Sequence, residues 1–405
     1  MPHEWSNWSG SVCCQPRELL APAGEEEVVA IVGRAAAAGQ IVRVTGTGHS
    51  FTPLCASDDV LLSLDRLAGI ESVDAARGCA WIRAGSKIHD LGRPLAEHGL
   101  ALENQGDVDV QAIAGAVSTG THGTGPTLGS ISTQLVGLRI VTAAGDVLDG
   151  SSEADAEVFR AAQVSLGALG VITAVRLRLA PLYRLHEQVR REPLDACLES
   201  LDERIRANRH FEFFWYPADD VAMTKTLNPT DRPPTPPAAE DSAEEGTGLS
   251  SRERERVDES WRIFPTVREN RFNEMEYSVP AEHGVECFLE VRELMRRRHT
   301  RVAWPLEYRT VAADDIFISP AQGRATVALS IHQGVGLPYE AFFSDAETIF
   351  RRHEGRPHWG KVHSLSGREL SELYPHWERF QSVRARLDPD GRFLNEHLRR
   401  LFMGD

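Results

Sequence analysis

The first 180 residues contain apolar positions at helical spacing in some segments and at strand spacing in others. Helices are predicted at residues 25–38, 86–98 and 155–163, and acidic residues open the first of these, as a helix dipole favours. Short runs of apolar and β-branched residues predict strands at 41–44, 60–64, 79–84, 135–142, 147–148 and 171–179. This mixture predicts an α+β lobe.

The pattern changes after Pro181. Residues 182–226 predict polar helices around an aromatic strand, FEFFWY, at 211–216. Residues 230–256 are rich in proline, serine and acidic residues, and they predict an exposed loop because they cannot bury enough apolar surface to offset the ordering entropy. Further strands are predicted at 272–279, 303–310 and 325–333, and further helices at 280–300 and 339–353. A second α+β domain is therefore expected over residues 182–350.

Composition and charge narrow the class of protein. The chain has 405 residues, of which 41% are hydrophobic and 25% charged, as in soluble globular proteins. Its net charge of −15 repels phosphate backbones, so nucleic acid is not an expected partner. No apolar run approaches the ~20 residues of a membrane span, and the N-terminus lacks a secretory pattern, so a cytoplasmic location is expected. The six cysteines show neither metal-site nor disulfide spacing, and no metal is expected.

A glycine turn follows the strand predicted at 41–44. The sequence VTGTGHSF at residues 44–51 can offer consecutive backbone N–H groups to an anion. A nicotinamide-dinucleotide fingerprint would require a third glycine where Phe51 stands, and a helix after it, so that cofactor is not predicted. Taken alone, this turn is most simply a tight turn.

A second glycine-rich segment strengthens the case for a cofactor. The sequence IAGAVSTGTHGTG at residues 113–125 has four glycines and four hydroxyl residues within thirteen positions. Such a run supplies N–H and hydroxyl donors for a pyrophosphate, although a Gly/Thr-rich hairpin is the alternative. A third run, SLGALGVIT at 165–173, lies in the same lobe. Together the three segments favour a nucleotide-type cofactor.

These segments resemble the flavin-binding lobe of the vanillyl-alcohol-oxidase superfamily. Within it, the sequence is similar to the sugar-1,4-lactone oxidases and dehydrogenases and to the related alditol oxidases, and RPHWGK at 356–361 is the nearest motif match. The resemblance runs from about residue 7 to residue 395, and residues 230–256 interrupt it. It implies an α+β fold with a two-lobed FAD-binding domain (1–181), an α+β substrate cap (182–350) and a C-terminal segment (351–405) that completes the flavin and active sites.

The resemblance implies that FAD is the cofactor. It implies a covalent bond between His49 and the flavin 8α-methyl group, whereas a histidine hydrogen-bonded within its turn is the alternative. In relatives, a side chain at the position of Gly106 shields the flavin from O₂, so a glycine there favours oxidase behaviour. The residues implied to contact FAD are Thr45, Gly46, Thr47, Gly48, His49, Ser50, Gly106, Asp107, Ala112, Gly115, Ala116, Val117, Ser118, Thr119, Gly120, His122, Gly123, Val171 and His358.

A third cluster, WPLEYR at 304–309, carries a carboxylate and a guanidinium. Strand alternation would put Glu307 and Arg309 on one face, about 7 Å apart along the chain. They can accept and donate hydrogen bonds to a polyhydroxylated substrate, although a plain ion pair is the alternative. The resemblance implies catalytic roles for both and for Lys361, whose charge would stabilise reduced flavin. Implied substrate contacts are Asp107, Glu307, Arg309, Ser330, His332 and Lys361.

The expected activity is FAD-dependent oxidation of a sugar-derived 1,4-lactone such as L-gulono-1,4-lactone. The expected route is hydride transfer from C2 to flavin N5, with O₂ as electron acceptor and H₂O₂ as product, and another acceptor as the alternative. An alditol oxidase acting on a terminal hydroxyl of xylitol or sorbitol is a second possibility, but these enzymes carry a serine where this chain has Asp107. A non-catalytic protein without flavin is a third. The catalytic base and the oligomeric state stay open.

Overall fold

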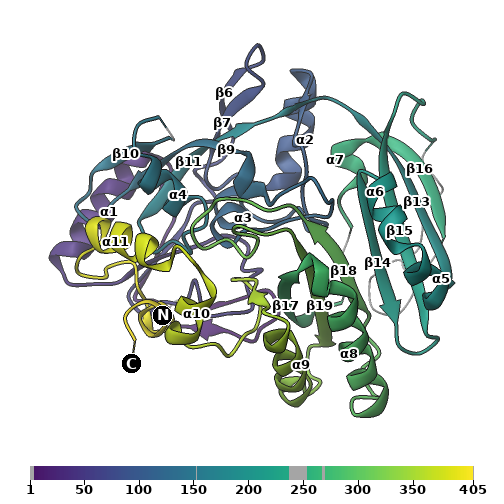
Figure 1. Ribbon diagram of the computed structural model, residues 1–405. Helices are drawn as coiled ribbons and strands as arrows, with labels where there is room; N and C mark the ends of the chain where they lie inside the picture. The colour runs from purple at the N-terminus through teal and green to yellow at the C-terminus, as the bar shows by residue number, and fades with distance from the viewer. Residues whose placement is uncertain (1–3, 152, 237–252, 267–269, 405) are drawn as a thin grey trace.

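The computed structural model describes residues 4–151, 153–236, 253–266 and 270–404. Two small sheets form the N-terminal lobe (Figure 1). Three parallel strands have the order β3 (Glu18–Leu20), β5 (Val60–Ser63), β4 (Val42–Thr45). Five antiparallel strands have the order β10 (Val147–Gly150), β9 (Leu135–Val141), β11 (Val171–Arg178), β7 (Cys79–Arg83), β6 (Ile70–Asp74).

Helices complete this lobe, and their apolar faces turn inward. They are α1 (Glu25–Ala37), α2 (Ile88–Glu97), α3 (Ile113–Thr119) and α4 (Ala156–Ala162). In α1, Val28, Val32 and Ala35 recur at helical spacing and are buried, and the helix contacts β9. The short strands β1 (Trp5–Ser6) and β2 (Cys13–Cys14) pair as an N-terminal hairpin, and β8 (Leu100–Ala101) pairs with β12 (Ala180–Pro181).

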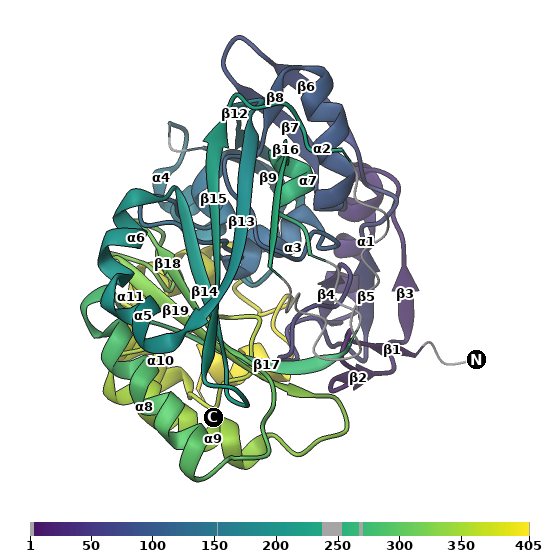
Figure 2. The same cartoon turned by 90° about the vertical axis from the view of Figure 1, so that its right-hand side faces the viewer.

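A single eight-stranded sheet dominates the rest of the chain (Figure 2). Its order is β16 (Arg254–Glu259), β13 (Arg184–Pro193), β15 (Val221–Thr230), β14 (His210–Tyr216), β18 (Leu306–Val311), β19 (Thr326–Gly334), β17 (Phe272–Pro280), β20 (Arg356–Pro357). Helices α5 (Leu194–Glu199), α6 (Leu201–Ala207), α8 (Gly284–Arg297) and α9 (Glu340–Arg352) pack on it. The short α7 (Ser260–Ile263) follows β16.

Strand alternation gives this sheet an apolar face and a polar face. Phe213 of β14 stacks on Tyr308 of β18 at 4.9 Å and meets Phe288 of α8 edge-on at 5.2 Å, so this face carries the helices. The intervening residues Glu212 and Glu307 therefore lie on the opposite face, where the candidate site lies.

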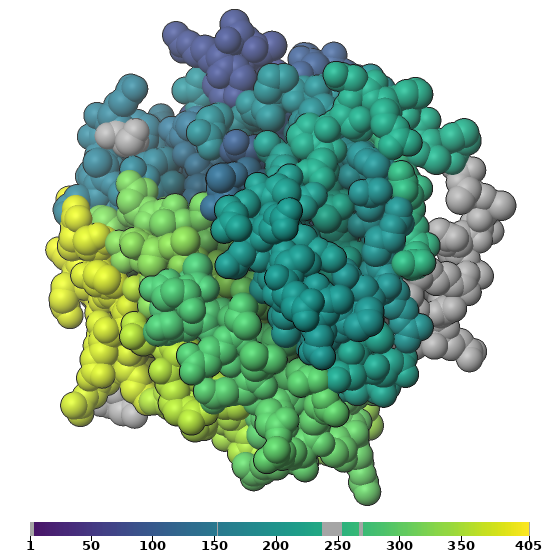
Figure 3. All heavy atoms as spheres, turned by 45° about the vertical axis from the view of Figure 1, so that its right-hand side comes forward, coloured from purple at the N-terminus to yellow at the C-terminus, as the bar shows by residue number. Residues whose placement is uncertain are grey.

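The C-terminal segment joins the two parts. Its helices α10 (Gly367–Leu373), α11 (Trp377–Leu387) and α12 (Glu396–Phe402) return to the N-terminal lobe, where α11 contacts α4 (Figure 1). Its first strand, β20, instead pairs with β17 of the eight-stranded sheet. Figure 3 shows the yellow C-terminal residues beside green residues of the second half of the chain on one face of the molecule.

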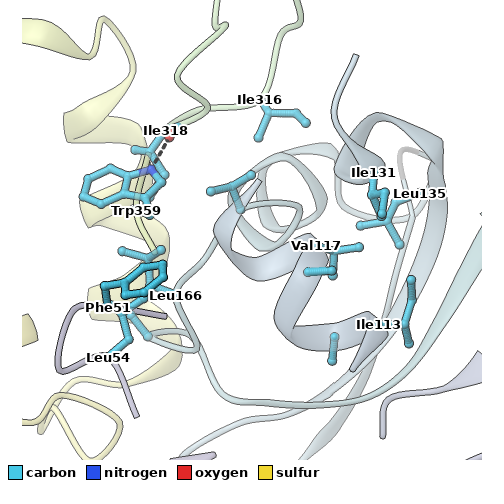
Figure 4. Packing of buried hydrophobic residues seen from close by; sticks show 14 of the residues in the cluster. Phe51, Leu54, Ile113, Val117, Ile131, Leu135, Leu166, Ile316, Ile318 and Trp359 are labelled. Carbon is cyan, nitrogen blue, oxygen red and sulfur yellow. Dashed lines mark hydrogen bonds between the residues drawn. The ribbon is translucent and has the colours of Figure 1, made fainter. Parts of the chain in front are cut away.

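A buried cluster fixes the C-terminal segment near the first glycine turn. Phe51, Leu54, Leu166 and Trp359 belong to one apolar core (Figure 4). The indole N–H of Trp359 donates to the carbonyl of Ile318 at 2.7 Å. This packing holds the segment that carries the downstream Lys361.

Most of the predicted elements of the N-terminal lobe are confirmed, but in the second half one prediction is wrong and one loop has different bounds. Residues 182–226 were expected to be mainly helical, yet they contain the long strands β13 and β15 and only the short helices α5 and α6. Polar side chains are tolerated there because both strands pair with neighbours on each side. The predicted loop 230–256 is shorter, since Thr230 ends β15 and Arg254 begins β16; residues 237–252 lie outside the described residues.

None of the helices described is long and apolar enough to cross a membrane.

Candidate active site

A cleft in the N-terminal lobe brings the glycine-rich segments together. It contains about 910 Å³ of empty space, counted with its open mouth. Leu166, Gly167, Gly170 and Ile172 line it from the third run. Predicted cofactor residues that line it are Thr45, Gly46, Thr47, Gly48, His49, Ser50, Ala112, Gly115, Ala116, Ser118 and Thr119.

Four predicted cofactor residues line neither this cleft nor the second cavity that adjoins it. Val117 and Val171 are fully buried in the core, and Gly120 ends α3 in the left-handed conformation, at φ 74°. Gly123 packs against Gln105, whose carbonyl would lie 2.4 Å from a Cβ at this position. The second glycine-rich segment is thus a short helix followed by a turn, and Ala114 and Ala116 are the residues in it that favour a helix.

Close backbone approaches shape the cleft. A Cβ at Gly46 would lie 3.0 Å from the Cβ of Ala112, and one at Gly85 would lie 1.8 Å from the carbonyl oxygen of Leu64. Gly85 and Gln111 line the cleft and were not predicted from the sequence. The buried Oε1 of Gln111 has no hydrogen-bond partner within the described part of the chain. Backbone N–H groups and hydroxyls are therefore the donors offered to a pyrophosphate, and Gln111 adds an unused polar group. This donor set fits FAD.

A second cavity, of about 780 Å³ of empty space, adjoins the first. His49, Ser50, Gln111 and Thr119 line both, so the histidine stands at their junction. Other predicted site residues in its lining are Gly106, Asp107, His122, Glu307, Arg309, His332, His358 and Lys361. Among the predicted substrate contacts, Ser330 does not line this cavity. Its hydroxyl donates a hydrogen bond to Glu276, which does.

The polar face of the eight-stranded sheet forms one wall of the second cavity. Glu307 of β18 faces Ser330 of β19 in register, and Ser330 faces Glu276 of β17. Arg309 faces Glu212 of β14. Directly opposed residues share a face, so these side chains gather on one side of the sheet. The prediction that Glu307 and Arg309 lie on one face is confirmed.

Arg309 is held by three carboxylates. It lies 2.7 Å from Asp107, 3.0 Å from Glu212 and 3.1 Å from Glu307. Burial opposes its charge, yet Glu307, Glu212 and Asp107 together raise its pKa. The guanidinium is therefore a fixed cation in the cavity wall.

A buried lysine extends this network. The ammonium of Lys225 lies 3.3 Å from Asp107 and 3.1 Å from Glu212. One oxygen of Asp107 thus faces Lys225 and the other faces Arg309. Glu212 and Lys225 were not predicted as site residues. The one available indication was the position of Glu212 between aromatic residues in FEFFWY.

Two further carboxylates, Glu274 and Glu276 on β17, hold the other cations. Lys361 forms an ion pair with Glu274 and lies 5.1 Å over the ring of Phe51. Burial alone would raise the pKa of Glu274, but the charge of Lys361 and the imidazole of His332 lower it to about 2. Lys361 is thereby fixed at the edge of the cavity.

Glu276 accepts hydrogen bonds from two side chains. The hydroxyl of Ser330 donates at 2.6 Å and His122 Nε2 lies at 2.9 Å. His122 Nδ1 lies 2.9 Å from the carbonyl of Gly123, so both ring nitrogens face acceptors. Despite burial, the charge of Glu276 raises the pKa of His122, and His122 lowers that of Glu276 well below its usual value. Each group therefore favours the charged form of the other.

The Lys361–Glu274 pair predicts a pH-dependent stability. The pKa of Glu274 is about 2 in the folded protein, which is below its value in the unfolded chain. The ion pair therefore contributes its full stability above the unfolded pKa, and this stability is lost as the pH falls through the folded pKa. We expect Glu274→Gln to be less stable than wild type at pH 7, and the difference to narrow between about pH 5 and pH 2. Urea unfolding at several pH values measures it. A difference that stays constant with pH would contradict the assigned ion pair.

His49 is a half-buried, neutral imidazole. Burial first, and then the charge of Lys361, lower its pKa to about 4. The indole of Trp8 stacks on it at 5.0 Å. Within the residues described, no hydrogen bond to the imidazole is found. His358, in the same wall, is also buried, which lowers its pKa to about 4.

Gly106 makes a close backbone contact. A Cβ there would lie 3.0 Å from the carbonyl oxygen of His122 and 3.5 Å from a methyl group of Thr121. Packing against residues 121–122 is therefore sufficient to explain the glycine. Its expected role in oxidase behaviour stays a prediction.

Comparison with known proteins identifies the family. The D-arabinono-1,4-lactone oxidase family model matches residues 175–250 and 242–401, and an FAD binding domain model matches 16–151. The chain is 40% identical to L-gulono-1,4-lactone dehydrogenase of Mycobacterium tuberculosis over 98% of each chain. It belongs to the FAD-linked sugar-1,4-lactone oxidase family. A more distant relative is the alditol oxidase of a Streptomyces species, 30% identical over 98% of this chain and 99% of that protein.

The fold agrees with this family. Cholesterol oxidase of Brevibacterium sterolicum superposes with a TM-score of 0.84 at 16% identity, covering 99% of this chain and 97% of that one. The predicted α+β fold of the vanillyl-alcohol-oxidase type is therefore confirmed. As a member of the sugar-1,4-lactone oxidase family, the protein is an FAD-dependent oxidoreductase that acts on CH–OH groups.

Proposed function

We propose that this protein oxidises a sugar-derived 1,4-lactone, such as L-gulono-1,4-lactone, at its C2 hydroxyl. The observation that carries the proposal is the junction at His49, where a glycine-rich cleft suited to FAD meets a cavity lined by Glu307, Arg309 and Lys361. In this proposal residues 1–181 bind FAD, residues 182–350 form the cap, and residues 351–405 contribute Lys361 and His358.

The fixed charges of the cavity suit a neutral, polyhydroxylated substrate. Bound FAD would supply the acceptor for the hydride that leaves C2. The carboxylate of Glu307 accepts hydrogen bonds from substrate hydroxyls, and Arg309 and Lys361 stabilise negative charge on the oxygen that loses its proton. Asp107, Ser330 and His332 complete the proposed substrate contacts, with Asp107 orienting Arg309.

The choice between lactone and polyol depends on Asp107. Its oxygens face Lys225 and Arg309, so its charge is already compensated within the cavity wall. Alditol oxidases place a serine here to orient a polyol, and this departure favours the lactone. The test is dye-coupled turnover of L-gulono- and D-arabinono-1,4-lactone against xylitol and sorbitol. We expect kcat/KM to be at least about tenfold higher for a lactone; the reverse order would assign an alditol oxidase.

Molecular oxygen is the proposed electron acceptor, with H₂O₂ as product. The support is Gly106, which presents no side chain to the second cavity. Stopped-flow mixing of the reduced enzyme with oxygenated buffer measures the step. We expect reoxidation faster than that of free reduced flavin, whereas a rate no faster than free flavin would assign a dehydrogenase that uses another acceptor.

We propose that His49 carries FAD covalently through the flavin 8α-methyl group. The supporting observations are its place at the junction of both cavities and its neutral imidazole. After acid precipitation, the wild-type pellet is expected to keep its yellow colour, and His49→Ala is expected to release FAD into the supernatant. Release of flavin from the wild type would rule out the bond.

A further inference from the structure

The N-terminal hairpin is fastened to the turn on both sides of His49. The backbone N–H of Trp8 donates to the carbonyl of Gly48 at 2.8 Å. The side-chain amide of Asn7 donates to the carbonyl of Ser50 at 3.0 Å. Gly48 has φ +71°, and a Cβ there would lie 3.2 Å from Cα of Asn7. The backbone of the hairpin can therefore pack this closely against the turn because residue 48 has no side chain.

The indole of Trp8 covers the imidazole itself. The two ring centroids lie 5.0 Å apart and the planes differ by 23°, which is a stacked arrangement. The indole is in turn held edge-on by Phe272 at 5.2 Å and Phe51 at 6.4 Å. Within the described residues no hydrogen bond to the imidazole is found, and the indole plane lies against one face of the ring.

The C-terminal segment holds the turn from another direction. The backbone N–H of Phe51 donates to the carbonyl of Gly360 at 2.7 Å, and the hydroxyl of Thr52 donates to that of Trp359 at 3.0 Å. The backbone around residue 49 is thus fixed by two separate segments. What remains free is the side-chain torsion of His49, and the stacked indole opposes that motion.

We infer that Trp8 is a positioning residue for the covalent attachment of FAD: it holds the His49 imidazole in the one orientation from which the bond forms. The inference rests on the proposed covalent bond. Forming that bond replaces a C–H of the 8α-methyl group and an imidazole N–H by one C–N bond. Two electrons and two protons are released, and they pass through FAD to O₂ or another two-electron acceptor. Holding a reacting atom in place raises the rate of such a step without altering binding.

The test separates bound flavin from covalently bound flavin. Wild type, Trp8→Ala, Trp8→Phe and Trp5→Ala are produced in one host, and total flavin per chain is measured by absorbance. The acid-stable fraction is then measured as flavin fluorescence of the protein band in a denaturing gel. Trp5 is the matched control, because it belongs to the same hairpin and lies against Gly48 at 3.5 Å from the position of a Cβ.

We expect Trp8→Ala to keep its total flavin within about twofold of wild type, while its covalent fraction falls by about fivefold or more. Trp8→Phe retains a stacking ring and is expected to keep most of the covalent fraction, as is Trp5→Ala. An unchanged covalent fraction in Trp8→Ala would overturn the inference. So would a parallel loss of total flavin, which would make Trp8 part of the cofactor cleft rather than a support for the imidazole. A wild type that releases all its flavin in acid would instead refute the covalent bond, before any variant is compared.

Discussion

Arg309→Lys is expected to lower kcat/KM for the lactone substrate by about 100–1,000-fold while FAD stays bound. The native guanidinium contacts Asp107, Glu212 and Glu307 at once and still lines the cavity. A lysine keeps the charge but has no planar fork of donors, so it cannot satisfy three carboxylates and a substrate oxygen together. The measurement is dye-coupled turnover, with flavin content determined on the same samples.

The matched control is Arg296→Lys on the outer helix α8. Arg296 also pairs with a carboxylate, that of Asp220 at 2.9 Å, but its side chain is 47% exposed and does not line the cavity. This variant is expected to retain wild-type activity. A loss of less than about threefold for Arg309→Lys would show that the guanidinium does not contact the reacting substrate.

Arg43→Met is expected to lower the free energy of unfolding by roughly 3–5 kcal/mol. Arg43 is 3% exposed and donates to the carbonyls of Leu54, Leu166, Gly167 and Phe393. It thereby joins three distant segments of the chain. Methionine fills a similar volume but donates no hydrogen bond, so four carbonyls lose a donor.

The same change is expected to weaken the retention of FAD. Leu166 and Gly167 line the first cleft, and Leu166 has a positive φ of 55°, a conformation that its bond to Arg43 supports. Urea unfolding measures the stability, and Arg17→Met is the control because the Arg17 side chain is 74% exposed. A loss below about 1 kcal/mol in Arg43→Met would mean that water replaces the guanidinium at these carbonyls.

The sequence was informative where a residue and its neighbours form a short motif. The turn around His49, the alternation of Glu307 and Arg309, and the segment that carries Lys361 each predicted a site residue, and the structure brings all of them to one cavity. These motifs are formed by neighbouring residues, so they can be recognised without knowledge of the fold.

The missed residues depend on pairing between distant strands. Glu212 meets both Arg309 and Lys225 only because β14 lies between β18 and β15. Glu274 meets Lys361 because β17 pairs with β20, the strand that precedes this lysine, and Glu276 meets His122 from the N-terminal lobe. The residues next to them in the sequence give no indication of these contacts between strands.

The wrong helices at residues 182–226 have a related cause. From the sequence, Glu187 of β13 is expected to face solvent. In the structure it is fully buried and forms ion pairs with Arg254 at 2.8 Å and Arg256 at 2.5 Å on the adjacent strand β16. A buried charge with partners supplied by another strand removes the apolar alternation by which a strand is recognised. The sequence reading therefore failed where tertiary contacts satisfied polar side chains.

Anaerobic mixing of the purified holoenzyme with L-gulono- and D-arabinono-1,4-lactone tests the central claim most directly. The account predicts that at least one lactone bleaches the visible flavin band, with a rate that saturates with lactone concentration and is abolished in Glu307→Gln. A flavin band that persists in the presence of both lactones but bleaches with xylitol or sorbitol would contradict it.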